Sequence, residues 1–288
     1  MDIAFLGIGL MGKPMASRLL QHGHAVSAWS RTRANAEALV AYGATVADSA
    51  AQAVATADVI ITMLENGDAV EQVLMCESTL QALTSGSLVI DMSSIAPQQA
   101  KDHASRLARI GIRYLDAPVS GGTGGAETGT LAIMAGGDES DIACAATIWA
   151  ALGRVTHVGP HGGGQLAKLA NQMIVGMSIG AVAEALFLVE RLGGDPIKTI
   201  AAMSGGFADS KILSLHGTRM ASRDFAKRAT MRVQLKDLDN ALKAAGELEL
   251  PITALTRSLY SSAVHRGDAE LDHSALWRQI DFTNQLQN

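Results

Sequence analysis

The stretch IAFLGIGLMG, residues 3–12, decides the class of fold. Its first four residues form an apolar run without polar alternation, as expected of a parallel strand that is covered on both faces. Glycines then follow in a G-x-G-x-x-G spacing and lead into a helical pattern. Between a strand and a helix, this spacing provides a tight turn, close backbone approach to a pyrophosphate and helix N–H groups that face the anion. We therefore expect a dinucleotide site, with the cofactor contacted by Gly7, Gly9, Leu10, Met11 and Gly12.

The alternation of strand and helix patterns continues through the first half of the chain. Apolar strand-like runs occupy residues 25–29, 59–63, 88–92, 113–115 and 131–134, with helical patterns around 49–56, 68–74 and 97–110. This order predicts an α/β fold, with a Rossmann-like, mostly parallel sheet over residues 1–162.

Helical periodicity dominates the second half of the chain. Helical patterns cover residues 166–192, 196–203, 235–247, 254–266 and 274–282. Residues 163–288 are therefore expected to form an all-helical substrate or dimerisation domain, which the chain enters through a long interdomain helix.

The second predicted strand ends in Ser30, Arg31 and Thr32. An NAD site usually places Asp or Glu about 20 residues past the glycines, on the ribose hydroxyls, and no acid occupies this position. Arginine and hydroxyl groups suit a 2′-phosphate instead, so NADP is the expected cofactor and NAD the alternative. In the competing interpretation, Arg31 and Arg33 are only the solvated start of the next helix.

Two later strand ends supply further cofactor contacts. Ligands bind at the carboxyl ends of parallel strands, which places Met63, Leu64 and Ser94 along the expected cofactor site. A hydroxyl in such a position can instead be a helix cap.

The loop at residues 116–123, with the sequence DAPVSGGT, is a candidate substrate site. Pro118 stiffens it, while Ser120, Gly121 and Gly122 expose a hydroxyl and bare backbone N–H groups, an arrangement that suits a carboxylate. The alternative is an ordinary glycine-rich loop.

A second candidate site is the segment GGGQLAKLANQ, residues 162–172. The glycine run is expected to release the chain before a long apolar helix. Lys168 and Asn171 are three residues apart, so they lie on one helical face and can point at one small molecule. Lysine is rarely buried unless it is paired or functional, and the alternative is a lysine that snorkels at the helix start.

Composition and charge exclude several classes of protein. The net charge is −5 and there is no basic run, which argues against nucleic acid as a partner. Cys76 and Cys144 lack a CxxC spacing and the N-terminus lacks the features of a signal peptide, so a reducing, cytoplasmic location is expected. The longest apolar run, residues 173–183, is too short for a membrane span of about 20 residues and is expected to be buried in protein.

The histidines do not suggest a metal site. His157, His161 and His273 have no metal-ligand spacing, and we therefore expect no bound metal.

Taken together, these segments resemble the β-hydroxyacid dehydrogenase family, which includes 3-hydroxyisobutyrate dehydrogenases and 2-hydroxy-3-oxopropionate (tartronate semialdehyde) reductases. The matching segments are residues 7–12, 116–122, 162–171 and 236–241, in the family's order over nearly the whole chain. The sequence DHSAL at residues 272–276 is most similar to the tartronate semialdehyde reductase branch.

Two positions depart from the family pattern. Gln172 stands where some members carry a second asparagine, and residues 225–229 lack the usual Pro-Gly pair. These departures affect the choice of substrate rather than the reaction class.

The resemblance implies roles for individual residues. Lys168 matches the catalytic lysine and Asn171 the polar partner beside it. The loop of Ser120, Gly121 and Gly122 matches the segment that holds the substrate carboxylate. Ser94 matches a hydroxyl residue near the nicotinamide ribose, and Lys236 a residue that closes over the cofactor from the second domain.

The implied activity is reversible hydride transfer between NADP(H) and the carbonyl carbon of a small semialdehyde acid, with Lys168 as general acid in reduction. The closest resemblance is to 2-hydroxy-3-oxopropionate reductase; a 3-hydroxyisobutyrate dehydrogenase or another short semialdehyde reductase is the alternative. Small residues at Gly176 and Gly180 leave a surface on the long helix that another backbone can approach closely, either within the chain or across a dimer. Together with the resemblance, this surface implies a homodimer or homotetramer.

Three other functions are alternatives to this hydroxyacid dehydrogenase activity. Imine reductases share the overall pattern without the lysine. A decarboxylating sugar-phosphate dehydrogenase of the 6-phosphogluconate dehydrogenase superfamily needs a larger helical domain than 288 residues allow. A non-catalytic NADP(H)-binding module would bind the cofactor without turnover.

Overall fold

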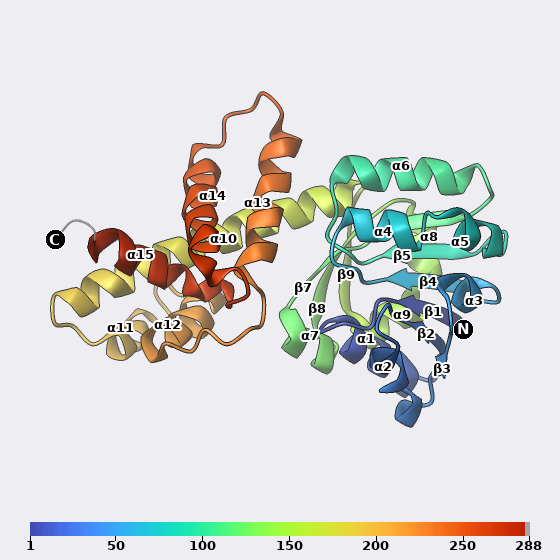
Figure 1. The fold of residues 1–288 in the computed structure, drawn as a ribbon, viewed down its shortest axis with the longest axis horizontal. Helices are drawn as coiled ribbons and strands as arrows, with labels where there is room; N and C mark the ends of the chain where they lie inside the picture. The colour runs from blue at the N-terminus through green and yellow to red at the C-terminus, as the bar shows by residue number, and fades with distance from the viewer. Residues whose placement is uncertain (286–288) are drawn as a thin grey trace. The chain divides into compact units, whose positions relative to one another are not determined.

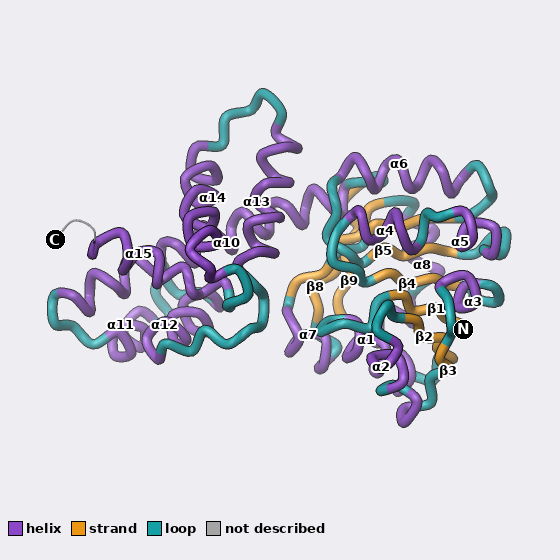
Figure 2. The backbone as a smooth tube through the Cα atoms, in the orientation of Figure 1, coloured by secondary structure: helices purple, strands orange, loops and turns teal. Residues whose placement is uncertain are grey.

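The computed structural model describes residues 1–285, and the chain folds into two compact units, Met1–Lys168 and Leu169–Asn288. The strands belong to the first unit, whereas the second consists of helices and loops (Figure 2). The boundary between the units falls inside helix α10 (Gly163–Arg191).

A nine-stranded sheet forms the centre of the first unit, in the order β3-β2-β1-β4-β5-β6-β8-β7, with β9 beside β8. The first six strands of this order are mutually parallel, and β8 runs antiparallel to β6 and β7. This confirms the predicted Rossmann-like, mostly parallel sheet. The strands are β1 (Asp2–Leu6), β2 (Ala25–Trp29), β3 (Thr45–Val46), β4 (Val59–Thr62), β5 (Leu88–Asp91), β6 (Arg113–Asp116), β7 (Val119–Ser120), β8 (Leu131–Gly136) and β9 (Gly153–Gly159).

Helices cover both faces of this sheet, and Figure 1 shows α4, α5 and α6 on one side and α1 and α2 on the other. Successive strand residues point to opposite faces, so Phe5 joins one apolar core and Leu6 the other. The helices of this unit are α1 (Gly12–Gln21), α2 (Arg33–Glu37), α3 (Ala50–Val54), α4 (Gly67–Val73), α5 (Glu77–Ala82), α6 (Pro97–Ala108), α7 (Gly122–Thr128), α8 (Glu139–Cys144) and α9 (Ala146–Leu152).

Three strands escaped the sequence analysis for identifiable reasons. Strands β3 and β7 are only two residues long, too short for a periodic pattern. Strand β9 pairs only with β8 and lies at the edge of the sheet, where Arg154 and Thr156 alternate with less hydrophilic residues. An exposed edge strand does not need the continuous apolar run by which the buried strands were recognised.

The second unit packs its helices around the C-terminal part of α10. Its elements are α11 (Pro196–Met203), a π-helical turn η2 (Leu213–Gly217), α12 (Thr218–Ser222), α13 (Met231–Ala245), α14 (Pro251–Ala263), a second π-helical turn η3 (Val264–Asp268), a short 3₁₀ turn η4 (His273–Ala275) and α15 (Leu276–Gln285). This bears out the expected helical second half. Its core is formed by residues such as Ile179, Leu238, Tyr260 and Leu276.

The small residues of α10 serve packing within the chain. A Cβ at Gly176 would lie 2.7 Å from Nε2 of Gln234 in α13, and one at Gly180 would face Leu276 of α15. Ala183, on the same side, is fully buried. The sequence left open whether this face meets the same chain or a second copy, and in the structure it meets the same chain.

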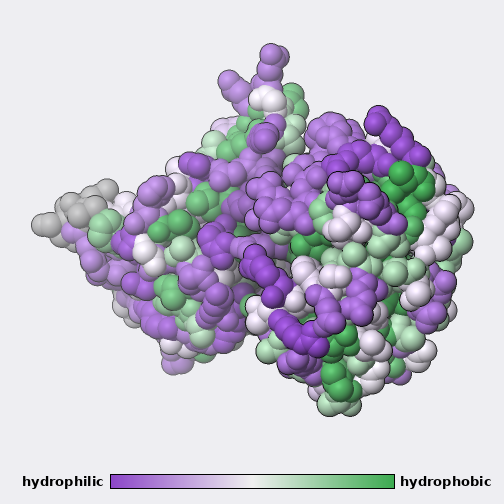
Figure 3. Space-filling model, turned by 45° about the vertical axis from the view of Figure 1, so that its right-hand side comes forward, coloured by the Kyte–Doolittle hydropathy of each residue, from purple (hydrophilic) through white to green (hydrophobic). Residues whose placement is uncertain are grey.

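Helix α10 covers the helix expected over residues 166–192, but its apolar stretch is longer and more exposed than residues 173–183 suggested. Its most apolar 18-residue window has a mean hydropathy of 1.8, so by length and composition alone the helix could cross a membrane, and only 28% of that window is buried. The expectations that the apolar run of residues 173–183 is too short for a span and that it is buried were therefore wrong, because single polar residues interrupt the apolar run without ending the helix. One such helix is weak evidence for a membrane span, since core helices share its length and composition. Hydrophilic residues cover most of the face drawn in Figure 3.

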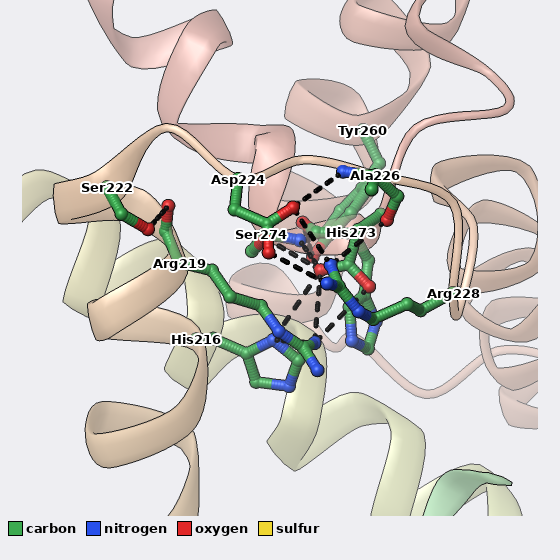
Figure 4. Close-up of polar contacts among 10 residues, drawn as sticks. His216, Arg219, Ser222, Asp224, Ala226, Arg228, Tyr260, His273 and Ser274 are labelled. Carbon is green, nitrogen blue, oxygen red and sulfur yellow. Dashed lines mark hydrogen bonds and ion pairs between the residues drawn. The ribbon is translucent and has the colours of Figure 1, made fainter.

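A buried carboxylate, Asp272, joins several elements of the second unit. It accepts hydrogen bonds from the backbone N–H and the hydroxyl of Ser274, at 3.1 and 2.6 Å, and it lies 3.4 Å from Nη1 of Arg219. Figure 4 shows His216 and Arg219 pointing toward His273 and Ser274. Burial alone would raise the pKa of Asp272, but His216, His273 and the Ser274 hydrogen bonds outweigh it and hold the pKa well below its usual range.

We predict that Asp272→Ala lowers the free energy of unfolding by about 3 kcal/mol at pH 7, because it leaves a largely buried guanidinium without its carboxylate. Because the pKa of Asp272 is depressed, this contribution is complete above the ordinary aspartate pKa of about 3.9 and is lost as the pH falls below it. Urea denaturation followed by circular dichroism measures both effects. Asp239→Ala is the matched control, because it breaks a half-exposed pair with Arg257 and should cost less than about 1 kcal/mol. Equal losses in the two variants would contradict the prediction.

Candidate active site

The carboxyl ends of four parallel strands bring the predicted cofactor residues to one edge of the sheet. Leu6 at the end of β1 is in register with Trp29 of β2 and Thr62 of β4, and Thr62 is in register with Asp91 of β5. The segments that follow these strands therefore begin side by side. They contain Gly7, Gly9, Leu10, Met11 and Gly12 after β1, Ser30, Arg31 and Thr32 after β2, Met63 and Leu64 after β4, and Ser94 after β5.

The glycine loop has the close contacts that the motif predicts. Gly7 has φ +109°, and a Cβ on it would lie 2.4 Å from the carbonyl oxygen of Met63. A Cβ on Gly12 would lie 2.0 Å from the carbonyl oxygen of Gly7, whereas Gly9 is exposed and faces open space. Helix α1 begins at Gly12. In its first turn the N–H of Lys13 donates to the carbonyl of Gly9, that of Met15 donates to the carbonyl of Met11, and Pro14 has no N–H, so the N–H of Gly12 is the one that remains for an anion at this loop. The loop thus fits a pyrophosphate, which would approach the backbone at Gly9.

The structure distinguishes the two arginines after β2. Arg33 is engaged by Glu37, at 2.8 Å, and by Asp48. Arg31 is exposed and makes no hydrogen bond or ion pair within residues 1–285. Ser30 and Thr32 flank it, and Thr32 precedes the first residue of α2 without capping it through its side chain. Arg31 is therefore the arginine that is available to a phosphate.

Backbone links hold the cofactor residues after β4 and β5. The N–H of Met63 donates to the carbonyl of Leu6 at 2.9 Å, and the N–H of Leu64 donates to the hydroxyl of Ser93 at 2.9 Å. The structural hydroxyl at this position is thus that of Ser93, and the next residue, Ser94, is only partly buried.

The predicted carboxylate loop is more ordered than a plain glycine-rich loop. Val119 and Ser120 form strand β7, and helix α7 starts at Gly122. Gly121 and Gly122 have φ +138° and +63°, a conformation that favours glycine, and both are exposed. The loop therefore presents a hydroxyl and two bare backbone N–H groups, as the sequence suggested.

Lys168 is buried rather than snorkelling, with 9% of its surface exposed. Its Nζ donates a hydrogen bond of 2.8 Å to the carbonyl oxygen of Val119. The ammonium group is thereby fixed beside the peptide that leads into Ser120. The structure thus brings together the predicted catalytic lysine and the predicted carboxylate loop.

Asn171 and Lys236 belong to the second unit, where a polar network contains both. The side-chain amide of Asn171 donates to Oε1 of Gln172 at 2.8 Å, and Gln172 donates to Asp237 at 3.0 Å. Lys236 lies 3.2 Å from the carboxylate of Asp237. Gln172, a departure from the family pattern, therefore links α10 to α13.

Asp116 and Gln165 lie in the two segments that the sequence singled out, at residues 116–123 and 162–172, but neither was a predicted site residue. Both are fully buried. Asp116 ends β6 in register with Asp91 at the end of β5, and its carboxylate accepts hydrogen bonds from the N–H groups of Gly162 and Gln165, at 2.7 and 2.9 Å. Burial raises the pKa of Asp116 to about 6, with a smaller contribution from Asp91, against the two N–H donors that lower it. The sequence signal that could have identified Asp116 is that two consecutive buried strands, β5 and β6, both end in an aspartate.

The glycine run before α10 permits close packing rather than releasing the chain. A Cβ on Gly164 would lie 2.4 Å from the carbonyl oxygens of both Asp116 and Met134. The expectation of a released chain was wrong, because these glycines allow the first turn of α10 to approach the ends of β6 and β8 closely.

Tertiary structure also assembles a group of possible metal ligands that sequence spacing missed. One ligand atom from each of His216, Asp272 and His273 lies within 4.8 Å of the others, and all three residues are buried. Nη1 of Arg219 lies 3.4 Å from both His216 and Asp272. Because this guanidinium already supplies positive charge to the carboxylate, we interpret the group as an ion-pair network.

Comparison with known proteins gives a consistent assignment for both parts of the chain. Residues 2–159 match the family described as the NAD binding domain of 6-phosphogluconate dehydrogenase, and residues 162–280 match the NAD-binding domain of NADP-dependent 3-hydroxyisobutyrate dehydrogenase. The chain is 40% identical to 2-hydroxy-3-oxopropionate reductase of Escherichia coli over 98% of each chain. It is 38% identical to 3-hydroxyisobutyrate dehydrogenase of Pseudomonas aeruginosa, over 96% of this chain and 95% of the other. The structure of Mycobacterium tuberculosis 3-hydroxyisobutyrate dehydrogenase with L-serine has a TM-score of 0.87 and 33% identity, covering 96% of this chain and 98% of that one.

Proposed function

Since the chain belongs to the β-hydroxyacid dehydrogenase family and is an NAD(P)-dependent enzyme, we propose that it reduces a small semialdehyde acid, with 2-hydroxy-3-oxopropionate as the preferred substrate. The observation that carries the proposal is the buried ammonium group of Lys168, held 2.8 Å from the Val119 carbonyl beside Ser120. The similarity to 2-hydroxy-3-oxopropionate reductase supports the choice of substrate, and 3-hydroxyisobutyrate dehydrogenation is the alternative.

The residues of the first unit account for binding and proton transfer. The loop of Gly7, Gly9 and Gly12 would hold the pyrophosphate, and the bound nicotinamide would supply the redox chemistry. The hydroxyl of Ser120 and the N–H groups of Gly121 and Gly122 would bind the substrate carboxylate.

Lys168 would donate a proton to the substrate oxygen during reduction and accept it back during oxidation. Its bond to the Val119 carbonyl holds the ammonium beside the carboxylate loop, so that it needs little reorganisation to reach a bound substrate. For Asn171 and Lys236, the family resemblance supports roles as the polar partner of Lys168 and as a cofactor contact.

The burial of Lys168 also argues against the two alternative functions, an imine reductase and a non-catalytic NADP(H)-binding module. An imine reductase would lack the lysine, and a non-catalytic module would have no need to bury an ammonium group at the carboxylate loop.

Assays of 2-hydroxy-3-oxopropionate, methylmalonate semialdehyde, succinic semialdehyde and glyoxylate, each with NADPH and NADH, test the substrate and the cofactor. An amine-plus-ketone assay tests the imine reductase alternative.

We predict that Lys168→Ala lowers kcat for the best of these substrates about 10²- to 10⁴-fold, because the reaction loses its proton donor. The Kd for NADPH, measured by fluorescence titration, should change less than about twofold, since the lysine does not hold the cofactor. Undiminished turnover in this variant would exclude the role assigned to Lys168.

We propose NADP as the physiological cofactor, because Arg31 is exposed and without a partner in the described chain. Arg31→Ala should raise KM for NADPH about tenfold, by loss of a charge-assisted phosphate contact, and leave KM for NADH nearly unchanged. Arg33→Ala is the matched control, because Glu37 and Asp48 already engage that guanidinium. An equal effect of Arg31→Ala on the two cofactors would rule out a 2′-phosphate contact.

We further propose that the protein is a homodimer or homotetramer. The exposed side of α10 carries an apolar stripe of Ala170, Ile174, Ala181, Ala185, Leu188 and Leu192. These residues recur at helical spacing, and an uncovered apolar stripe of this length favours association.

Light scattering should therefore give two or four times the 30.0 kDa chain mass. Leu188→Glu should shift the protein toward the monomer, because it introduces a charge into the apolar contact. Leu248→Glu, at an exposed leucine outside the stripe, should not do so. A monomeric wild-type protein would disprove the assembly.

A further inference from the structure

The proposed role of Lys168 raises the question of what holds its ammonium group in place. The lysine lies in the first turns of α10, and the glycines before it allow many backbone conformations in an isolated chain. Two buried side chains connect this helix start to the strand ends, and neither has been given a role so far. They are Asp116, at the end of β6, and Gln165, one helical turn before Lys168.

The carboxylate of Asp116 binds the start of α10 at two points. One oxygen accepts from the N–H of Gly162 at 2.7 Å, and the other accepts from the N–H of Gln165 at 2.9 Å. The first N–H groups of a helix have no partner within the helix, and the helix dipole favours a negative charge there. A single carboxylate therefore sets both the position and the rotation of the first helical turn.

The side chain of Gln165 attaches the same turn to a second strand end. Its carbonyl oxygen accepts from the N–H of Ile95 at 3.0 Å, and its amide group donates to the carbonyl of Ser93 at 2.9 Å. These two residues flank Ser94 in the segment after β5. Gln165 thereby connects the helix that carries Lys168 to the segment that carries a predicted cofactor contact.

Two contacts, three residues apart on each segment, join the segment after β6 to the start of α10. The carboxylate of Asp116 accepts from the N–H of Gln165, and the carbonyl of Val119 accepts from the ammonium of Lys168. A shift or rotation of the helix that breaks the first contact would also move the ammonium away from the Val119 carbonyl. Gly164 lies between the strand ends without room for a side chain, which limits such movement further.

We propose that Asp116 and Gln165 are positioning residues for Lys168: they hold the first turn of α10 so that the ammonium group meets the Val119 carbonyl beside Ser120. The proposal rests on the proposed function, in which Lys168 donates the proton. Neither residue needs to touch substrate or cofactor for this purpose.

The electrostatics of Asp116 support a functional reason for its presence. Asp91 and Tyr114 face it from β5 and β6, and burial raises its pKa to about 6. A raised pKa means that the folded protein favours the protonated acid, so ionisation of this group weakens stability as the pH rises from about 4 through 6. At neutral pH the fold thus retains a carboxylate that costs stability, as expected where the two charge-assisted N–H bonds serve the site.

The test compares two near-isosteric variants with two matched controls. Asp116→Asn replaces one acceptor oxygen by a donor group, and Gln165→Met removes both hydrogen bonds at similar volume. Asp141→Asn alters another buried aspartate of the first unit, paired with Arg113, and Gln279→Met alters another buried glutamine, in α15. The side chains of the two control residues bind Arg113 and Arg266 instead.

We expect both test variants to lower kcat about 10- to 100-fold, since an error of about 1 Å in the position of a reacting group can cost 10²-fold. KM and Kd for NADPH should stay within about threefold, and the controls should keep kcat within about threefold. Loss of kcat with intact cofactor affinity distinguishes positioning from general damage to the fold. A kcat near that of the wild type in both test variants would overturn the proposal.

A second measurement does not depend on turnover. Lys168 is buried and hydrogen-bonded, so acetic anhydride should acetylate it slowly in the wild-type protein, as followed by mass spectrometry. Labelling of Lys168 should become at least about tenfold faster in Asp116→Asn and Gln165→Met and stay unchanged in the controls, because local opening exposes the amine. Unchanged labelling in the test variants would show that they do not hold the lysine. If the wild-type enzyme has no turnover but the labelling changes as expected, the proposed function fails and the structural role of the two residues stands.

Discussion

The hydrogen bonds from the N–H groups of Gly162 and Gln165 to the Asp116 carboxylate are the contacts on which the arrangement of the site depends. They join the end of a buried strand to the start of a 29-residue helix, in a place too crowded for any side chain at Gly164. The position of Lys168, in the first turns of the helix, depends on this junction. Because a helix is stiff over a few turns, fixing its first turn determines where a residue one turn later can reach.

The cofactor side of the site depends on close backbone approach rather than on many side chains. Gly7 and Gly12 lie where a Cβ would collide with a carbonyl oxygen, whereas Gly9 leaves its surroundings open. The parallel register of β1, β2, β4 and β5 then aligns the segments that follow these strands. The same feature of parallel sheets, strand ends that meet at one edge, aligns Asp91 with Asp116, the acid that holds α10.

In the described part of the helical unit no sheet aligns the segments, so the helices must be positioned by contacts between their side chains. Its helices use buried polar contacts in addition to their apolar core. Asp272 connects Arg219 and Ser274, and Gln172 connects α10 to Asp237 of α13. Such contacts have strict geometry and therefore select one packing of helices among several of similar hydrophobicity. The side of α10 that these contacts leave uncovered is the side with the apolar stripe.

Local patterns in the sequence were sufficient for the order of elements, for the glycine loop and for the candidate residues Lys168 and Ser120. Buried parallel strands require continuous apolar runs, and a phosphate loop requires glycine at particular steps, so both are visible in a short window. The edge strand β9 and the two-residue strands β3 and β7 were missed, since their pairing depends on neighbours distant in sequence. The glycines at 162–164 were misread because flexibility and close packing select the same residue.

The sequence by itself thus determined the family, the class of fold and the types of residue that the chemistry requires. Only the tertiary structure decided that Arg33 is already engaged while Arg31 is not, that Ser93 rather than Ser94 holds the Leu64 backbone, and that Asp116 and Gln165 hold the helix of Lys168. The physical reason is that periodicity and motif spacing report on neighbours along one segment. The partner of a buried polar group is chosen by packing between segments far apart in the chain, as with Asp116 and Gln165.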